Sequence, residues 1–235
     1  MHLGILQCDT VREEFRPRFG DYPVMFTKLL DGVDEGLHYT VYDVRNGNYP
    51  PATDACDAYL LTGSRWGVYD NQPWISTLAA YIRKLHREKR RLVGICFGHQ
   101  LIALALGGHA ARSRNGWGVG VATVQVHAQP AWMQPVREEF SLIVSHQDQV
   151  TELPPGAQCI ANNEFCRYAA LTIEDNVLTF QGHPEFDHEL SRALIEWRRE
   201  LLGAERTAAG MASLEIPVHD VDVAAWMVNF MRGDV

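Results

Sequence analysis

The sequence predicts an α/β fold with a mostly parallel central sheet that is flanked by helices and extended by an antiparallel strand portion. In the first half, short apolar runs rich in β-branched residues alternate with segments of helical periodicity. In the second half, strand-like runs follow one another closely. Alternating strands and helices indicate a parallel sheet with crossover helices. A chain of 235 residues suits one domain or two small ones, and we expect a single domain over residues 1–235.

Strands of the first half are expected at residues 2–7, 38–44, 57–63 and 91–96, which read HLGILQ, HYTVYDV, DAYLLTG and RLVGIC. A helix is predicted over residues 73–91. Its apolar residues recur every three or four positions from Trp74 to Leu85, and Pro73 suits the first helical turn. This segment therefore supplies a crossover between two parallel strands.

Strand-like runs of the second half lie at residues 118–128, 140–147, 157–163 and 168–183. The last of them contains a tight turn at Asp175-Asn176, which predicts a hairpin. A helix is predicted over residues 188–203, where Gly203 provides the C-terminal stop. A final amphipathic segment at 222–233 is expected to pack back as another helix.

Composition and charge exclude several classes of function. The formal net charge is −8, and the one basic run, RKLHREKRR at 83–91, fits the solvated end of a helix, so nucleic-acid binding is not expected. No window reaches the roughly 18 apolar residues of a membrane span, and the N-terminus reads as a strand rather than a signal peptide. Five cysteines without a CxxC pair indicate free thiols in a reducing compartment, and we expect the cytoplasm.

Residues 94–98 read Gly-Ile-Cys-Phe-Gly, where a predicted strand changes into a helical pattern. A nucleophile on a sharp strand-to-helix turn needs small residues two positions away, because larger ones would collide. The turn places Cys96 at a helix N-terminus, where the dipole favours a thiolate, and aims the Phe97 N–H at an oxyanion. The alternative is that Cys96 is a small buried hydrophobe with glycines for close packing, and the turn alone does not decide between the two.

A second candidate group lies in FQGHPEF at 180–186. Pro184 favours an extended conformation for His183, and residues two apart in an extended chain point the same way. His183 and Glu185 therefore share a face, where the carboxylate can fix the imidazole tautomer and support its charge during proton transfer. Together with Cys96 they suit acyl transfer if the fold brings them together. The alternative is a structural histidine at the end of a strand.

The same stretch offers His183, Glu185, His188 and Glu189 as candidate metal ligands. The two histidines are five residues apart across a strand-to-helix junction, which is poor ligand geometry compared with an i, i+4 pair on one helix. We therefore expect no metal site here.

GICFGHQ at 94–100, followed by GHPE at 182–185, resembles the class I glutamine amidotransferases, the Cys-His-Glu glutaminase domain family. The resemblance spans the chain in order, from the first strand to the strand that carries His183. LLTGSRWGVYDNQPWI at 60–75 is similar to small stand-alone members, those that resemble the GMP synthase glutaminase domain and the γ-glutamyl peptidases. The resemblance implies a flavodoxin-like three-layer α/β fold.

Carried over residue by residue, the resemblance implies a catalytic triad and an oxyanion hole. Cys96 would be the nucleophile, His183 the general base and acid, and Glu185 its orienting partner. Gly63 falls where the family has its oxyanion-loop glycine, so its N–H would join that of Phe97. The chain departs from many members here, because it reads Thr62-Gly63-Ser64 where they have Pro-Gly-Gly.

Candidate substrate-binding residues also come from the resemblance. Gln100 matches a glutamine whose side chain touches the substrate. SHQDQV at 145–150 resembles the segment whose backbone holds the amino-acid end of glutamine, which makes Ser145 and Gln147 candidates. His146 of the same segment is a further candidate, for which the alternative is a place in a solvated loop.

These observations predict a hydrolase that cleaves the γ-glutamyl amide bond of glutamine or of a γ-glutamyl compound through a Cys96 thioester. The reaction needs no metal, nucleotide or redox cofactor. One alternative is a glutaminase subunit that delivers ammonia to a separate synthase, because the chain contains no synthase motif. Another is a non-catalytic regulator that binds a metabolite, although a regulator has no need of Cys96, His183 and Glu185 together.

Overall fold

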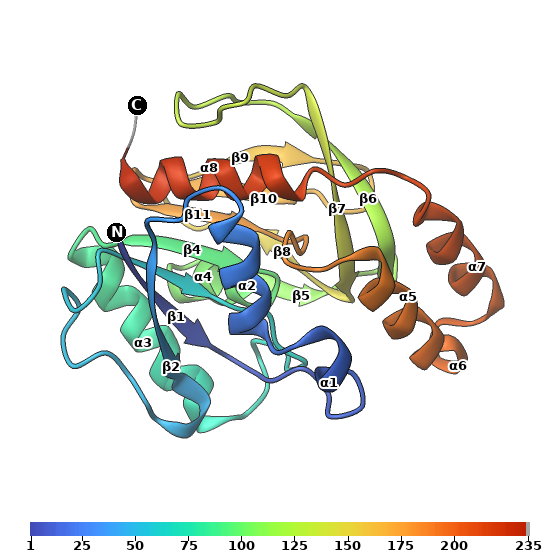
Figure 1. The fold of residues 1–235 in the computed structure, drawn as a ribbon, viewed down its shortest axis with the longest axis horizontal. Helices are drawn as coiled ribbons and strands as arrows, with labels where there is room; N and C mark the ends of the chain where they lie inside the picture. The colour runs from blue at the N-terminus through green and yellow to red at the C-terminus, as the bar shows by residue number, and fades with distance from the viewer. Residues whose placement is uncertain (234–235) are drawn as a thin grey trace.

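Strands from both halves of the chain build one mixed sheet (Figure 1). The computed structural model describes residues 1–233, and within them a nine-stranded sheet has the order β2-β1-β3-β4-β11-β10-β9-β6-β7, while β5 and β8 form a separate pair. The strands are β1 (His2–Gln7), β2 (His38–Asp43), β3 (Ala58–Leu61), β4 (Arg91–Ile95), β5 (His109–Arg112), β6 (Gly118–Val126), β7 (Glu139–His146), β8 (Asp148–Glu152), β9 (Ala157–Asn162), β10 (Ala170–Ile173) and β11 (Val177–Phe180).

The sheet has a parallel half and an antiparallel half. Strand β1 pairs in parallel with β2 and β3, β3 with β4, and β4 with β11. The remaining neighbours, from β11 through β10, β9 and β6 to β7, are antiparallel. The predicted α/β fold with a parallel core and an added antiparallel portion is confirmed.

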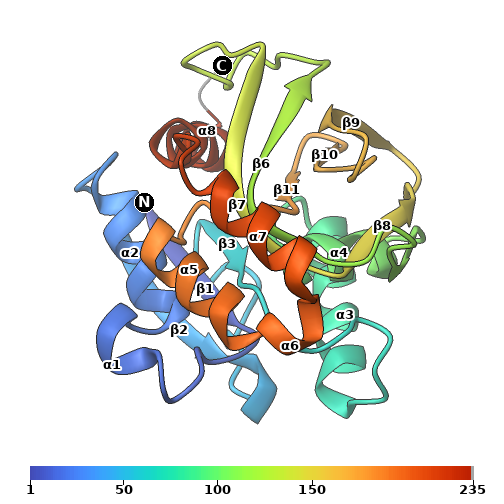
Figure 2. The same ribbon diagram turned by 90° about the vertical axis from the view of Figure 1, so that its right-hand side faces the viewer.

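Helices cover both faces of the parallel half (Figures 1 and 2). Helices α2 (Tyr22–Asp31) and α8 (Asp220–Arg232) bury Phe26 and Trp226 in one apolar core, together with Ile5 of β1. Helices α3 (Pro73–Arg87) and α4 (Phe97–Ala105) fill the core on the other face, where Leu78 and Leu101 pack. Strands buried on both sides explain the continuous apolar runs in the sequence.

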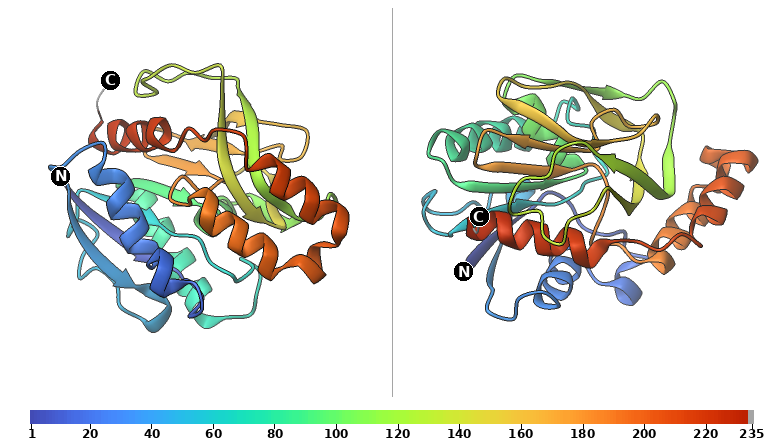
Figure 3. Two further views of the ribbon diagram at one scale, coloured as in Figure 1. Left: turned by 45° about the vertical axis from the view of Figure 1, so that its right-hand side comes forward. Right: turned by 90° about the horizontal axis from the view of Figure 1, so that it is seen from above.

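Helices α5 (His188–Trp197), α6 (Arg199–Leu202) and α7 (Ala204–Ser213) pack beside β6 and β7, at the far end of the molecule from α3 (Figure 3). The remaining short elements are α1 (Arg16–Phe19) and the 3-10 helix η1 (Val44–Asn46). None of the helices within residues 1–233 is long and apolar enough to cross a membrane.

One predicted helix differs from the structure. The segment 188–203 bends at Arg198, where φ is −95° and ψ is 10°, and it divides into α5 and α6. Backbone hydrogen bonds continue across the bend, from Arg198 N–H to Leu194 and from Leu202 N–H to Arg198. Gly203, with φ of 76°, ends α6 as expected. The bend leaves the Arg198 side chain beside the site described below.

The parallel half also places the candidate residues. Because β1, β3, β4 and β11 run in the same direction, their carboxyl ends meet at one edge of the sheet. Ligands of open α/β sheets bind outside these ends, close to the point where the strand order reverses. Here the order reverses between β1 and β3.

Candidate active site

Cys96 lies on the sharp turn between β4 and α4. Its φ of 52° and ψ of −98° are rare for a residue with a side chain. The flanking glycines make the turn possible: a Cβ at Gly94 would lie 2.8 Å from the backbone of Gly98, and a Cβ at Gly98 would lie 2.8 Å from the Leu61 carbonyl oxygen. The close approach of the backbone at both glycines leaves no room for larger residues, as the sequence predicts. The Cys96 side chain is buried but lines a cavity.

His183 follows β11, the strand next to β4. The Cys96 N–H donates to the Phe180 carbonyl at 2.8 Å and ties the turn to this strand. The His183 N–H donates to the Ile143 carbonyl at 2.8 Å, which anchors the loop to β7. These contacts bring Cys96 and His183 to the same edge of the sheet, although the two residues are 87 positions apart in the sequence.

Glu185 holds the His183 ring, as the extended spacing predicts. The His183 Nδ1 atom and the Glu185 carboxylate are 2.8 Å apart, and both side chains are almost fully buried. Phe186 stacks on the ring at 4.0 Å between centroids with an angle of 6°. With Nδ1 engaged by Glu185, the other ring nitrogen is left for Cys96.

The site favours a charged imidazole. Burial opposes a charge on His183, but the Glu185 carboxylate and the neighbouring Cys96 sulfur outweigh it and raise the pKa of His183 above its usual value. The thiolate is the nucleophilic form of a cysteine, and an imidazolium beside it can supply a proton. The arrangement can therefore perform nucleophilic attack and proton transfer.

The two predicted oxyanion donors lie next to this pair. Phe97 is the first residue of α4, where N–H groups have no partner within the helix. Gly63 packs closely against the His183 ring: a Cβ at this glycine would lie only 2.9 Å from the ring Cε1 atom. The Tyr22 ring also lies near this position, 3.6 Å from the same Cβ.

The four predicted substrate-binding residues all line the same cavity. Gln100 donates from Nε2 to the Asp148 carbonyl and to Gln181, so its Oε1 is the atom left for the cavity. The Ser145 hydroxyl accepts a hydrogen bond from Arg198, and the Gln147 carbonyl accepts one from the Ser113 N–H.

His146 is uncharged at neutral pH. Burial lowers the pKa of His146 to about 4, against the opposing contact of its Nδ1 atom with the Asp148 carbonyl. It can therefore offer a neutral ring to a ligand but no charge.

The cavity has a volume of about 480 Å³, within the range of roughly 300–1,000 Å³ that is typical of small-molecule sites. Aromatic side chains from separate loops and helices form much of its wall: Phe15, Tyr22, Trp66, Tyr69, Trp117, Phe186 and Trp197. Such a wall suits a ligand larger than a single small polar group.

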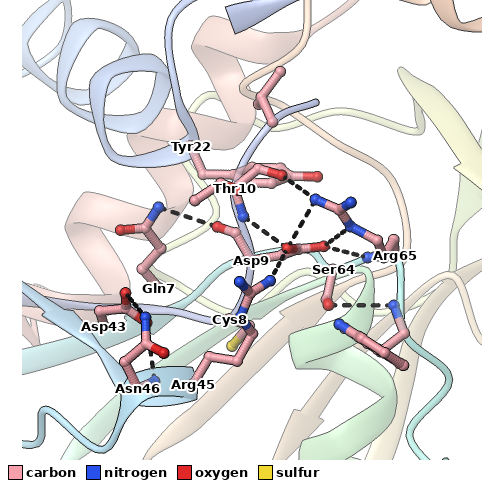
Figure 4. A network of polar contacts seen from close by, with 12 residues as sticks. Gln7, Cys8, Asp9, Thr10, Tyr22, Asp43, Arg45, Asn46, Ser64 and Arg65 are labelled. Atoms are coloured by element: carbon pink, nitrogen blue, oxygen red, sulfur yellow. Dashed lines mark hydrogen bonds and ion pairs between the residues drawn. The ribbon is translucent and has the colours of Figure 1, made fainter. Parts of the chain in front are cut away.

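Sequence reasoning missed the network around Asp9, in the loop after β1 (Figure 4). The Asp9 carboxylate is 1% exposed and accepts hydrogen bonds from Arg45 at 2.6 Å and from the Arg65 Nε at 2.7 Å. The Arg65 backbone N–H also donates to it, at 3.0 Å. Asp9 thus ties the loop after β1 to the loop that carries Gly63. Asp9 lies two residues after the end of the buried strand β1, and no motif marks it in the sequence.

The candidate metal ligands do not come together. The His188 ring bonds to the Ile216 carbonyl, and Glu189 forms an ion pair with Arg18 on the surface. Within residues 1–233 no cluster of metal-ligating side chains occurs. His183 and Glu185 instead form the buried pair described above.

Comparison with known proteins places these features in a family. The profile described as "Glutamine amidotransferase class-I" matches residues 42–197. Gamma-glutamyl peptidase 2 of Arabidopsis thaliana is 30% identical over 98% of this chain and 95% of its own length. Gamma-glutamyl peptidase 4 of the same plant is 32% identical over 82% of this chain and 79% of its own.

Solved structures share the fold at low sequence identity. A glutamine amidotransferase from Thermotoga maritima has a TM-score of 0.73 and 16% identity, covering 99% of this chain and 97% of its own. A glutamine amido transferase from Methylobacillus flagellatus has a TM-score of 0.69 and 22% identity, covering 97% of this chain and 94% of its own.

Proposed function

This chain belongs to the class I glutamine amidotransferase family, and we propose that it is a hydrolase that cleaves γ-glutamyl amide bonds through a thioester on Cys96. The observation that carries the proposal is the buried pair of His183 and Glu185, 2.8 Å apart, beside a cysteine on a strained strand-to-helix turn. The names of the related γ-glutamyl peptidases support a γ-glutamyl substrate.

In the first half of the reaction, the Cys96 thiolate attacks the amide carbon of the γ-glutamyl group. The N–H groups of Gly63 and Phe97 stabilise the oxyanion of the tetrahedral intermediate. His183, charged because its pKa is raised, donates its proton to the departing nitrogen. The amine leaves, and the γ-glutamyl group remains as a thioester on Cys96.

In the second half, neutral His183 takes a proton from water, and the resulting hydroxide attacks the thioester carbon. The sulfur leaves as a thiolate, glutamate is released, and His183 again carries its proton. Glu185 holds the ring orientation through both halves, since its carboxylate stays bonded to Nδ1.

A second candidate function is a glutaminase subunit that passes ammonia to a separate synthase. The observation in its favour is the exposed apolar rim of the cavity, where Tyr69, Trp197 and Leu201 are 50%, 47% and 65% exposed. Apolar side chains gathered at the mouth of a site suit a docking partner. The size and aromatic wall of the cavity favour the free hydrolase instead.

The test is glutamate release by the purified protein from L-glutamine and from a panel of γ-glutamyl dipeptides. We expect release from dipeptides that is lost in Cys96→Ala, because no other group in the cavity can form the thioester. Cys159→Ala is the matched control, since the Cys159 thiol lies outside the cavity and donates to the Ala161 carbonyl.

The outcomes separate the candidates. Efficient release from dipeptides that depends on Cys96 supports the free hydrolase. Slow release from glutamine alone supports the glutaminase subunit, and turnover that survives Cys96→Ala overturns the thioester mechanism.

A further inference from the structure

We propose that Arg198 recognises a carboxylate of the γ-glutamyl substrate, so that the cavity selects acidic γ-glutamyl compounds. The inference rests on the proposed hydrolase function and extends it to a recognition group. A γ-glutamyl peptide offers two such carboxylates, the α-carboxylate of the glutamyl group and the C-terminal carboxylate of the leaving group. The experiment below distinguishes them.

The Arg198 guanidinium is held in place at the cavity wall. It lies at the bend between α5 and α6 and shares the cavity with Cys96. Its Nη1 donates to the Ser145 hydroxyl at 3.2 Å, and its guanidinium lies 5.1 Å from the ring of Trp117 and 5.3 Å from that of Trp197. A guanidinium fixed in this way loses little freedom when it binds a planar anion.

Arg198 forms no ion pair with a carboxylate in the part of the chain that the structure describes, residues 1–233. Its one polar side-chain partner is the neutral hydroxyl of Ser145, and a second cation, Arg12, lies close enough to oppose it. Burial lowers the pKa of Arg198, although an arginine remains charged in proteins. A half-buried guanidinium without an acid, facing a cavity, is a ready site for an anion.

The acids of the cavity wall have partners of their own. Asp9 is engaged by Arg45 and Arg65, as described above. Asp70 accepts the Gly67 N–H at 2.9 Å. Burial raises the pKa of Asp148. A hydrogen bond from Tyr69 and the nearby charge of Arg112 act in the opposite direction and stabilise its carboxylate.

A substrate carboxylate would supply the missing partner. The planar guanidinium can donate two parallel hydrogen bonds to it, and charge-assisted pairs of this kind are about twice as strong as neutral ones. The competing role for Arg198 is to stabilise the Cys96 thiolate, since the two groups are close enough to interact electrostatically. That role predicts a loss that does not depend on which carboxylates the substrate carries.

The test compares Arg198→Met with the wild-type protein on three substrates: γ-glutamylglycine, γ-glutamylglycinamide, and γ-glutamylglycine with its α-carboxylate converted to the amide. We expect KM for γ-glutamylglycine to rise about 10- to 100-fold, with a smaller change in kcat. Arg199→Met is the matched control, because Arg199 is the next residue and pairs with Glu196 on the exposed face. Arg198→Lys keeps the positive charge but cannot donate two parallel hydrogen bonds to a carboxylate, so its KM should lie between those of Arg198→Met and the wild-type protein.

The substrates identify the carboxylate. If the C-terminal carboxylate is the ligand, γ-glutamylglycinamide is hydrolysed equally well by Arg198→Met and wild type. If the α-carboxylate is the ligand, the compound with the α-carboxylate converted to the amide is hydrolysed equally well by Arg198→Met and wild type. An equal fall of kcat on all three substrates with a displaced pH profile, or an unchanged KM for γ-glutamylglycine, overturns the inference.

A binding measurement separates this inference from the hydrolase proposal. Titration of γ-glutamylglycine into Cys96→Ala, with and without Arg198→Met, reports affinity without turnover. If the wild-type protein hydrolyses none of the compounds, the proposed function fails, while affinity that depends on Arg198 still supports the carboxylate site. Affinity that does not change with Arg198→Met overturns it.

Discussion

At the scale of single residues, the candidate site combines a strained backbone at Cys96 with a buried positive charge on His183. The backbone of Cys96 adopts a conformation that costs about 1–3 kcal/mol and persists because its surroundings impose it. The charge on His183 is maintained against burial by Glu185 and Cys96. Each residue thus depends on its neighbours for the state that the proposed chemistry requires.

Glu185→Gln should lower the pKa of His183, because burial would then act without an opposing carboxylate. The proposed mechanism needs the imidazolium to protonate the leaving amine. The alkaline limb of the kcat profile is therefore expected to move to lower pH, and kcat at neutral pH should fall about 10- to 100-fold. Measuring kcat between pH 6 and 10 checks this.

The control for this variant is Glu189→Gln, since Glu189 is exposed and pairs with Arg18. Its pH profile should match that of the wild-type protein. An alkaline limb that stays in place in Glu185→Gln would contradict the orienting role of Glu185.

Sequence alone indicated some of these residues and not others. Cys96 is recognisable from its flanking glycines, and His183 with Glu185 from their spacing beside a proline. Asp9 and Arg198 carry no motif. Their positions at the cavity depend on which loops the fold brings to one edge of the sheet, and this cannot be predicted from local sequence.

At the scale of elements, the turn between β4 and α4 depends on close packing against β3. Gly98→Ala would place a Cβ 2.8 Å from both the Cβ and the carbonyl oxygen of Leu61. A backbone oxygen cannot move aside as a side chain can, so α4 must shift. We expect a loss of about 1–3 kcal/mol in the free energy of unfolding. Urea unfolding measures the loss.

The same substitution should reduce activity by more than its effect on stability explains. Leu61 precedes Gly63 by two residues, so a shift here would separate the two proposed oxyanion donors. Gly32→Ala, at the end of α2 with φ of −65°, is the control and should leave turnover unchanged. Full activity in Gly98→Ala would show that the donors tolerate the displacement or are not used.

Element prediction from sequence succeeded where one pattern was strong. The runs at 2–7 and 91–96 became β1 and β4, and the hairpin with its turn at Asp175-Asn176 became β10 and β11. Strands β5 and β8 were missed, because β5 is short and both pair only with each other. The bend at Arg198 has no sequence signal, since neither proline nor glycine lies there.

At the scale of the whole molecule, the buried histidines are in opposite states. His99 and His146 are neutral, because burial lowers the pKa of His99 to about 3 and that of His146 to about 4. His183, at the same edge of the sheet, is held charged. At these three histidines the folded protein therefore binds fewer protons than the unfolded chain at acidic pH and more at alkaline pH.

This difference predicts a stability maximum near neutral pH. An unfolded histidine has a pKa of about 6.5. For His99 and His146 the folded pKa is lower, so their contribution is present above about pH 6.5 and is lost as the pH falls towards 4 and 3. For His183 the folded pKa is raised, so its contribution is present below about pH 6.5 and is lost as the pH rises through the folded value.

His99→Asn isolates one of these contributions. His99 is fully buried and its Nδ1 atom lies 2.8 Å from the Thr179 hydroxyl, a contact that the Asn side chain can replace without a titrating group. The free energy of unfolding, measured with urea from pH 4 to 9, should fall less steeply below pH 6.5 in this variant than in the wild-type protein. The alkaline decline should be unchanged, because His183 contributes to it and His99 does not. Parallel acid limbs in the two proteins would mean that His99 takes up its proton without unfolding the chain, and that another group governs acid stability.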